Sequence, residues 1–178
     1  VFGADGTKLS AERQARVEAG LQGELEDDGP SRCGRSLQRQ DLLRSYQDKL
    51  LSSVGDRRLN GVPIVLDLCW GSATACAAEV FQSLGAELTV LHGQPDGERI
   101  NVACGSTQLD PLRQAVVAQG AVMGFAFDGD ADRMLAVDAQ GRVVDGDHVL
   151  YLWGSVLQGQ KAVPGDGLVA TVGSSYGC

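Results

Sequence analysis

The chain has 178 residues, of which 43% are hydrophobic and 21% charged, as in a globular protein with one good core. Its formal net charge of −8 disfavours nucleic acid and anionic membranes as main partners, because both require a basic surface. No stretch reaches the roughly 18 consecutive apolar residues of a membrane span, and the N-terminus carries no charged-then-apolar signal pattern.

The cysteines point to a reducing compartment. There are five of them, an odd number, and none is spaced as C-x-x-C, which excludes both a disulfide framework and a zinc ribbon. We therefore expect free thiols that pack as small hydrophobic side chains, and a cytoplasmic location.

The first third of the chain predicts two helices and a connection between them. Residues 10–25 contain good helix formers, and Ser10 is a suitable N-cap. Residues 26–36 have no apolar period and are rich in turn formers, which indicates a domain boundary. Residues 41–54 return to helical spacing. Their predicted apolar face consists of Leu42, Leu43, Tyr46, Leu50 and Leu51.

Alternating strands and helices are predicted over the rest of the chain. In order they are a strand at 62–68, a helix at 73–84, a strand at 87–91, a helix at 110–119, and strands at 122–127 and 134–138. A helix capped by Asp145, Gly146 and Asp147 then runs to about residue 158, and 167–172 begins another strand.

The last two strands of this series predict the sheet type. The connection between them is too short for a parallel crossover, which needs about a dozen residues, so they form an antiparallel hairpin. The predicted fold is therefore α/β, with a mixed sheet of about four strands, the last one antiparallel, and helices on both faces.

An acidic loop between these strands is the main candidate for chemistry. Asp128, Asp130 and Asp132 alternate with Gly129 and Ala131, directly after an apolar strand. Two carboxylates about 5 Å apart repel by about 3 kcal/mol at an effective dielectric of about 20, and a bound divalent cation removes that cost. Oxygen ligands favour a hard cation, so the loop predicts a magnesium site.

Other interpretations of the acidic loop remain open. Aspartate and glycine are also the residues that solvated hairpin turns prefer. An Asp-x-Asp pair after a strand is also found in phosphatases that form an aspartyl phosphate, although in those a parallel crossover follows. A non-enzymatic cation-binding module is a third possibility. An EF-hand fits poorly, because its sixth and twelfth positions hold Arg133 and Ala139 here.

Arg133 directly follows the three acids and is a candidate for binding a phosphate group. A planar guanidinium beside a metal cluster binds phosphoryl oxygens well, and phosphoryl transfer requires a divalent ion together with such cations.

At this point the sequence resembles a known family. The segment Phe127-Asp128-Gly129-Asp130-Ala131-Asp132-Arg133 resembles the metal loop of the α-D-phosphohexomutases. Further segments at 2–10, 95–101 and 104–107 resemble the branch of that family that interconverts glucosamine 6-phosphate and glucosamine 1-phosphate.

The resemblance implies an enzyme with a hexosamine phosphate substrate, Mg²⁺ and a phosphoserine. Asp128, Asp130 and Asp132 are then the metal ligands, and Arg133 steadies the phosphate. Residues 1–30 become the end of the first domain, 38–160 the second domain, and 166–178 the start of the third. We expect an internal fragment, with the catalytic serine just before Val1, that is inactive by itself.

Overall fold

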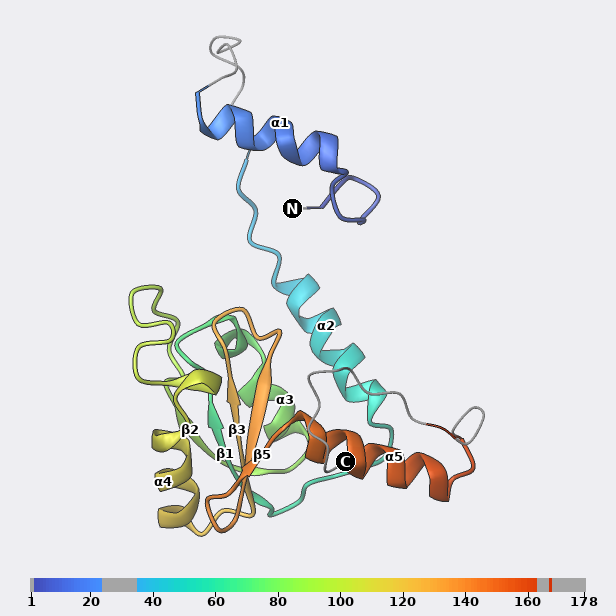
Figure 1. The fold of residues 1–178 in the computed structure, drawn as a ribbon, viewed down its shortest axis with the longest axis vertical. Coiled ribbons are helices and arrows are strands. Elements are labelled where there is room, and N and C mark those ends of the chain that lie inside the picture. The colour runs from blue at the N-terminus through green and yellow to red at the C-terminus, as the bar shows by residue number, and fades with distance from the viewer. Residues whose placement is uncertain (1, 24–34, 163–166, 168–178) are drawn as a thin grey trace. The chain divides into compact units, whose positions relative to one another are not determined.

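The computed structural model describes residues 2–23, 35–162 and 167 (Figure 1). Contacts divide the chain into two units, Val1–Gln38 and Arg39–Cys178. The first unit contains helix α1 (Ala11–Leu21), which begins after Ser10, the predicted N-cap; the Ser10 hydroxyl accepts a hydrogen bond from the Arg13 N–H at 3.4 Å. The predicted boundary at 26–36 lies almost entirely outside the described residues.

Among the described residues, five strands form one sheet in the order β2-β1-β3-β4-β5. The strands are β1 (Pro63–Asp67), β2 (Glu87–Leu91), β3 (Met123–Phe127), β4 (Met134–Asp138) and β5 (Val143–Val144). β1 pairs in parallel with β2 and β3, whereas β4 is antiparallel to both of its neighbours. The mixed sheet and its hairpin are confirmed, and β5 is an additional short strand.

The helices of the second unit are α2 (Gln40–Ser53), α3 (Ala77–Ser83), α4 (Asp110–Gln119) and α5 (Gly146–Gly159). Two 3₁₀ turns, η1 (Ser72–Ala75) and η2 (Gly105–Thr107), lie in the connections. The single helix predicted over 73–84 is wrong in part. Cys76 adopts φ −145°, far from helical values, and separates η1 from α3.

Helices cover both faces of the sheet, as predicted (Figure 1). Val65 of β1 belongs to a buried cluster with Leu112 and Val116 of α4. Its neighbours Ile64 and Leu66 belong to a second cluster, which includes Ala77 of α3. Since successive strand residues point to opposite faces, β1 is an interior strand of the sheet that packs against helices on both faces.

Helix α2 forms where a helix was predicted, but part of its predicted apolar face is exposed to solvent. Leu42 and Tyr46 are both more than half exposed, and the buried residue of the helix is Gln47. The Gln47 amide donates a hydrogen bond of 2.8 Å to Glu79 of α3. The helix therefore contacts α3 through a polar pair.

The C-terminal helix α5 begins as predicted. The Asp145 carboxylate accepts hydrogen bonds from the N–H groups of Asp147 and His148, in the manner of an N-cap. Only residue 167 of the strand predicted at 167–172 is described. Within the described ranges, no helix combines the length and the hydropathy that a membrane span requires.

Candidate metal centre

The acidic loop is the tight connection of the β3–β4 hairpin. Phe127 and Met134 are its last paired residues, and the Asp128 N–H donates to the Arg133 carbonyl at 3.3 Å. Ala131 adopts φ 60°, and its N–H donates to the Asp128 carbonyl at 3.2 Å, which turns the chain within the loop. The hairpin therefore holds all three acids within a single turn.

The three carboxylates converge. One oxygen from each of Asp128, Asp130 and Asp132 lies within 4.8 Å of the others. Their environments differ: the Asp128 side chain is only 1% exposed, whereas Asp130 and Asp132 lie at the surface. One acid is thus anchored in the protein, and two face the solvent.

The acids repel one another where they converge. The pKa of the Asp132 carboxyl is raised, first by the charge of Asp130, then by burial and by the charge of Asp128. A positive ion among the three oxygens reverses this effect, because it favours the charged form of each acid. The donor set of three carboxylates suits a hard divalent cation such as Mg²⁺.

Arg133 contacts the anchored acid. Its N–H and its Nε donate to the two oxygens of Asp128 at 3.2 and 2.7 Å, and its Nε lies 3.4 Å from Asp132. Burial acts to raise the pKa of the Asp128 carboxyl, but the N–H and guanidinium of Arg133 outweigh it and lower that pKa. The Arg133 side chain is itself 72% exposed, so its cation is available at the mouth of the loop.

The loop rests on neighbouring segments of the same sheet edge. The Ser72 N–H donates to the Gly129 carbonyl at 2.9 Å. A Cβ on Gly71 would lie only 2.9 Å from the Gly129 Cα, and a Cβ on Gly129 would collide with Ile100. Close backbone packing therefore fixes the position of Gly129, the residue between Asp128 and Asp130.

Comparison with known proteins identifies the family. Residues 44–141 match the model of phosphoglucomutase/phosphomannomutase, alpha/beta/alpha domain II. The chain belongs to this family. The acidic loop thus lies within the residues that match the second α/β/α domain of the phosphohexomutases, and the expected family resemblance is confirmed.

Relatives agree with the narrower resemblance. A phosphoglucosamine mutase of Parasynechococcus marenigrum (strain WH8102) is 93% identical over 177 residues, 99% of this chain and 38% of that protein. A phosphoglucosamine mutase of Synechococcus sp. (strain CC9902) is 68% identical, over 99% of this chain and 39% of that protein. The chain therefore spans about two fifths of the length of these relatives.

A solved phosphohexomutase structure supports the fold. The crystal structure of a phosphoglucomutase/phosphomannomutase family protein from Burkholderia thailandensis matches with a TM-score of 0.62 and 25% identity. The match covers 86% of this chain and 33% of that chain.

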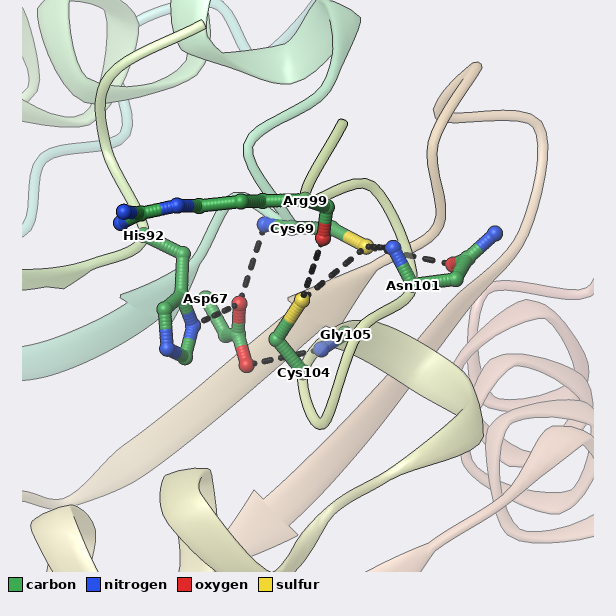
Figure 2. Close-up of polar contacts among 7 residues, drawn as sticks. All are labelled: Asp67, Cys69, His92, Arg99, Asn101, Cys104 and Gly105. Carbon is green, nitrogen blue, oxygen red and sulfur yellow. Dashed lines mark hydrogen bonds and ion pairs between the residues drawn. The ribbon is translucent and has the colours of Figure 1, made fainter. Parts of the chain in front are cut away.

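One buried acid of this phosphohexomutase domain was missed by the sequence analysis. Asp67, the last residue of β1, is fully buried and accepts three hydrogen bonds (Figure 2). Its Oδ1 accepts from the Cys69 N–H at 3.0 Å and contacts the His92 Nδ1 at 2.9 Å, while its Oδ2 accepts from the Gly105 N–H at 2.9 Å. The available signal was a charged residue inside the apolar run at 62–68.

Two thiols lie beside this acid. Cys69 and Cys104 are fully buried, with their sulfurs 3.7 Å apart, and both are free (Figure 2). Burial, followed by the contact with Cys69, raises the pKa of the Cys104 thiol to about 12. The prediction that these cysteines pack as small hydrophobic groups is consistent with this burial. Cys33 and Cys178 lie outside the described residues.

Proposed function

We propose that this chain is the metal-binding segment of a phosphohexomutase that interconverts glucosamine 6-phosphate and glucosamine 1-phosphate. The observation that supports the proposal most strongly is the convergence of three carboxylate oxygens, within 4.8 Å, at the carboxyl end of β3. The amino-sugar substrate is proposed from the relatives, which carry the name phosphoglucosamine mutase.

The residues of the loop have two proposed roles, metal binding and phosphate binding. Asp128, Asp130 and Asp132 would hold Mg²⁺, and Arg133 would bind a phosphoryl oxygen from the exposed side of the loop. The ion, when bound, withdraws charge from the transferred phosphoryl group. Arg133 also keeps Asp128 ionised and oriented, because it donates to both oxygens of that carboxylate.

The remaining parts of the reaction belong to the rest of the polypeptide. On this proposal the phosphoserine and the sugar-selecting loops come from segments outside this chain, and the chain by itself turns over no substrate. The domain limits at 1–30, 38–160 and 166–178, and the cytoplasmic location, are parts of the same proposal.

A mutase assay tests this function in a full-length polypeptide that contains this chain. We expect Mg²⁺-dependent interconversion of the glucosamine phosphates, and a loss of at least about tenfold in turnover for Asp130→Ala, which removes one ligand. Asp56→Ala, at an exposed acid of the same unit, is the control and keeps its activity. Wild-type turnover in Asp130→Ala contradicts the role of the loop.

Assays of the full-length polypeptide and of this chain alone separate the two alternative functions. A non-enzymatic cation-binding module binds Mn²⁺ but shows no mutase activity in the full-length form. A phosphatase of the aspartyl-phosphate type releases inorganic phosphate from sugar phosphates with this chain alone. The antiparallel β4, which resumes directly after the loop, argues against the phosphatase.

A further inference from the structure

We propose that Asp67 is a positioning residue for the metal loop, acting through the backbone of two connections, β1–α3 and β2–α4, that meet at the carboxyl edge of the sheet. The inference rests on the proposed function of the loop. It concerns a residue that makes no contact with the converging oxygens itself.

Asp67 is the last residue of β1 and lies at the carboxyl end of the strand, where the connecting loop begins. In the parallel registers it is paired with Leu91 of β2 and Ala126 of β3. Asp128 follows Ala126 by two residues, so the two buried acids lie on adjacent strands at the same edge. A carboxylate at this depth is stable only with donors on its oxygens, and it has three.

These donors come from three segments of two connections, since His92 and Gly105 lie near the two ends of the β2–α4 connection. Cys69 belongs to the segment after β1, His92 to the segment after β2, and Gly105 to η2 before α4 (Figure 2). One side chain therefore ties together segments up to 38 residues apart in the sequence.

Two of the segments that donate to Asp67 also pack against the metal loop or the strand end before it. Two residues beyond Cys69, Gly71 packs against Gly129, and the next N–H, that of Ser72, donates to the Gly129 carbonyl. Gly105 approaches the strand end from the other side, where a Cβ would lie 2.5 Å from the Phe127 carbonyl oxygen. The loop residues 127 and 129 thus rest on backbone that Asp67 holds.

The tied segments also adopt backbone conformations that need such support. Cys69, Trp70 and His92 have φ values of 55°, 56° and 51°, in the left-handed region that side chains disfavour. Such residues persist where surrounding contacts determine the conformation. The Asp67 carboxylate supplies those contacts at both Cys69 and His92.

The decisive experiment compares two aspartate-to-asparagine changes in a full-length polypeptide that contains this chain. Asp67→Asn replaces one accepting oxygen by an NH₂ group, which faces an N–H donor. Asp138→Asn is the matched control: Asp138 also accepts three hydrogen bonds, from Gln140 and Arg142, but pairs with Met123 at the opposite edge of the sheet. Mn²⁺ binding is measured by electron paramagnetic resonance, with thermal unfolding in parallel.

We expect Asp67→Asn to raise the Kd for Mn²⁺ by about tenfold or more, the size typical for residues that orient metal ligands. Asp138→Asn lowers the melting temperature but leaves the Kd unchanged. A folded Asp67→Asn protein with the wild-type Kd overturns the proposal. So does an equal rise in both variants, because the effect then follows general stability.

A second variant covers the case in which Asp67→Asn does not fold. His92→Phe removes one of the three donors and keeps an aromatic ring beside Trp70, whose ring centre lies 5.2 Å from that of His92. We expect a Kd rise of more than about twofold, and an unchanged Kd overturns the proposal. If the wild-type protein itself binds no Mn²⁺, the proposed function fails first, and the two failures are distinguishable.

Discussion

At the residue scale, Gly71 has no room for a side chain although its backbone allows one. Its φ of −100° and ψ of −158° are accessible to alanine, but an added Cβ would lie 2.9 Å from the Cα of Gly129. The cost of a substitution here therefore comes from contact alone. The affected neighbour is the backbone of the metal loop, which cannot move aside as a flexible side chain can.

Gly71→Ala is expected to lower the free energy of unfolding by about 1–3 kcal/mol and to weaken Mn²⁺ binding, because the loop is displaced. Gly97→Ala is the control, since nothing lies within 4 Å of its added Cβ. Urea unfolding and Mn²⁺ titration of both variants measure the two effects. Identical values for Gly71→Ala and Gly97→Ala contradict the close packing of Gly71 on the loop.

Asp138 provides a pH-dependent contribution to stability. The N–H of Arg142, then its guanidinium, lower the pKa of the Asp138 carboxyl below 3.8 in the folded protein. A group with a lowered pKa stabilises the fold above its unfolded value, and this stabilisation is lost as the pH falls through the folded value.

We therefore expect Asp138→Asn to melt below the wild type at pH 7, with the difference shrinking as the pH falls below 3.8. Differential scanning calorimetry from pH 7 to acid measures the difference. A gap in melting temperature that stays constant down to the most acidic pH at which both proteins fold refutes this account of Asp138.

Individual residues could be predicted from the sequence where they formed a local pattern. Asp128, Asp130 and Asp132 alternate with small residues after a strand, and the structure brings their oxygens together. Asp67 has no such pattern: its donors lie up to 38 residues away, and only the sheet brings them to one place. The ion pair of Arg133 with Asp128 also needed the closed hairpin, although the two residues are close in sequence.

At the element scale, α4 has one side in the core and one in solvent. Val116 is fully buried with Leu112 and Val65, whereas its neighbour Val117 is 56% exposed. The two valines have the same helix propensity, so the same substitution at each isolates the effect of burial. We expect Val116→Ala to cost about 2 kcal/mol and Val117→Ala less than about 1 kcal/mol.

Chemical unfolding of the two α4 variants tests this difference. The unfolding slope should stay the same in both, so that the midpoints report stability directly. Equal losses at positions 116 and 117 contradict the placement of α4 on the sheet.

The bounds of helices and strands could be predicted closely where a single hydrophobic periodicity extended over the whole element. The strand at 87–91 and the helix at 110–119 have the predicted bounds. The helix predicted over 73–84 is only partly present, as α3, because Cys76 interrupts the helical path although it is neither glycine nor proline. The two residues of β5 are too few for any periodicity, so this strand depends on pairing with β4.

At the scale of the whole molecule, the chain spans only part of the length of its relatives. The chain spans 38% of the P. marenigrum relative, and its loop supplies three carboxylates, fewer than the six ligands that Mg²⁺ prefers. A bound Mg²⁺ would therefore need further ligands from water or from groups outside the loop. We expect the full-length polypeptide to bind Mn²⁺ more tightly than this chain alone, and isothermal titration calorimetry of both forms measures the difference.

The most direct test of the metal site is anomalous diffraction from Mn²⁺-soaked crystals of a full-length polypeptide that contains this chain. The account predicts one strong peak in the turn between β3 and β4, with an oxygen of Asp128, Asp130 and Asp132 each about 2.1 Å away. Crystals that are saturated with Mn²⁺ but carry no peak among these three carboxylates would contradict it.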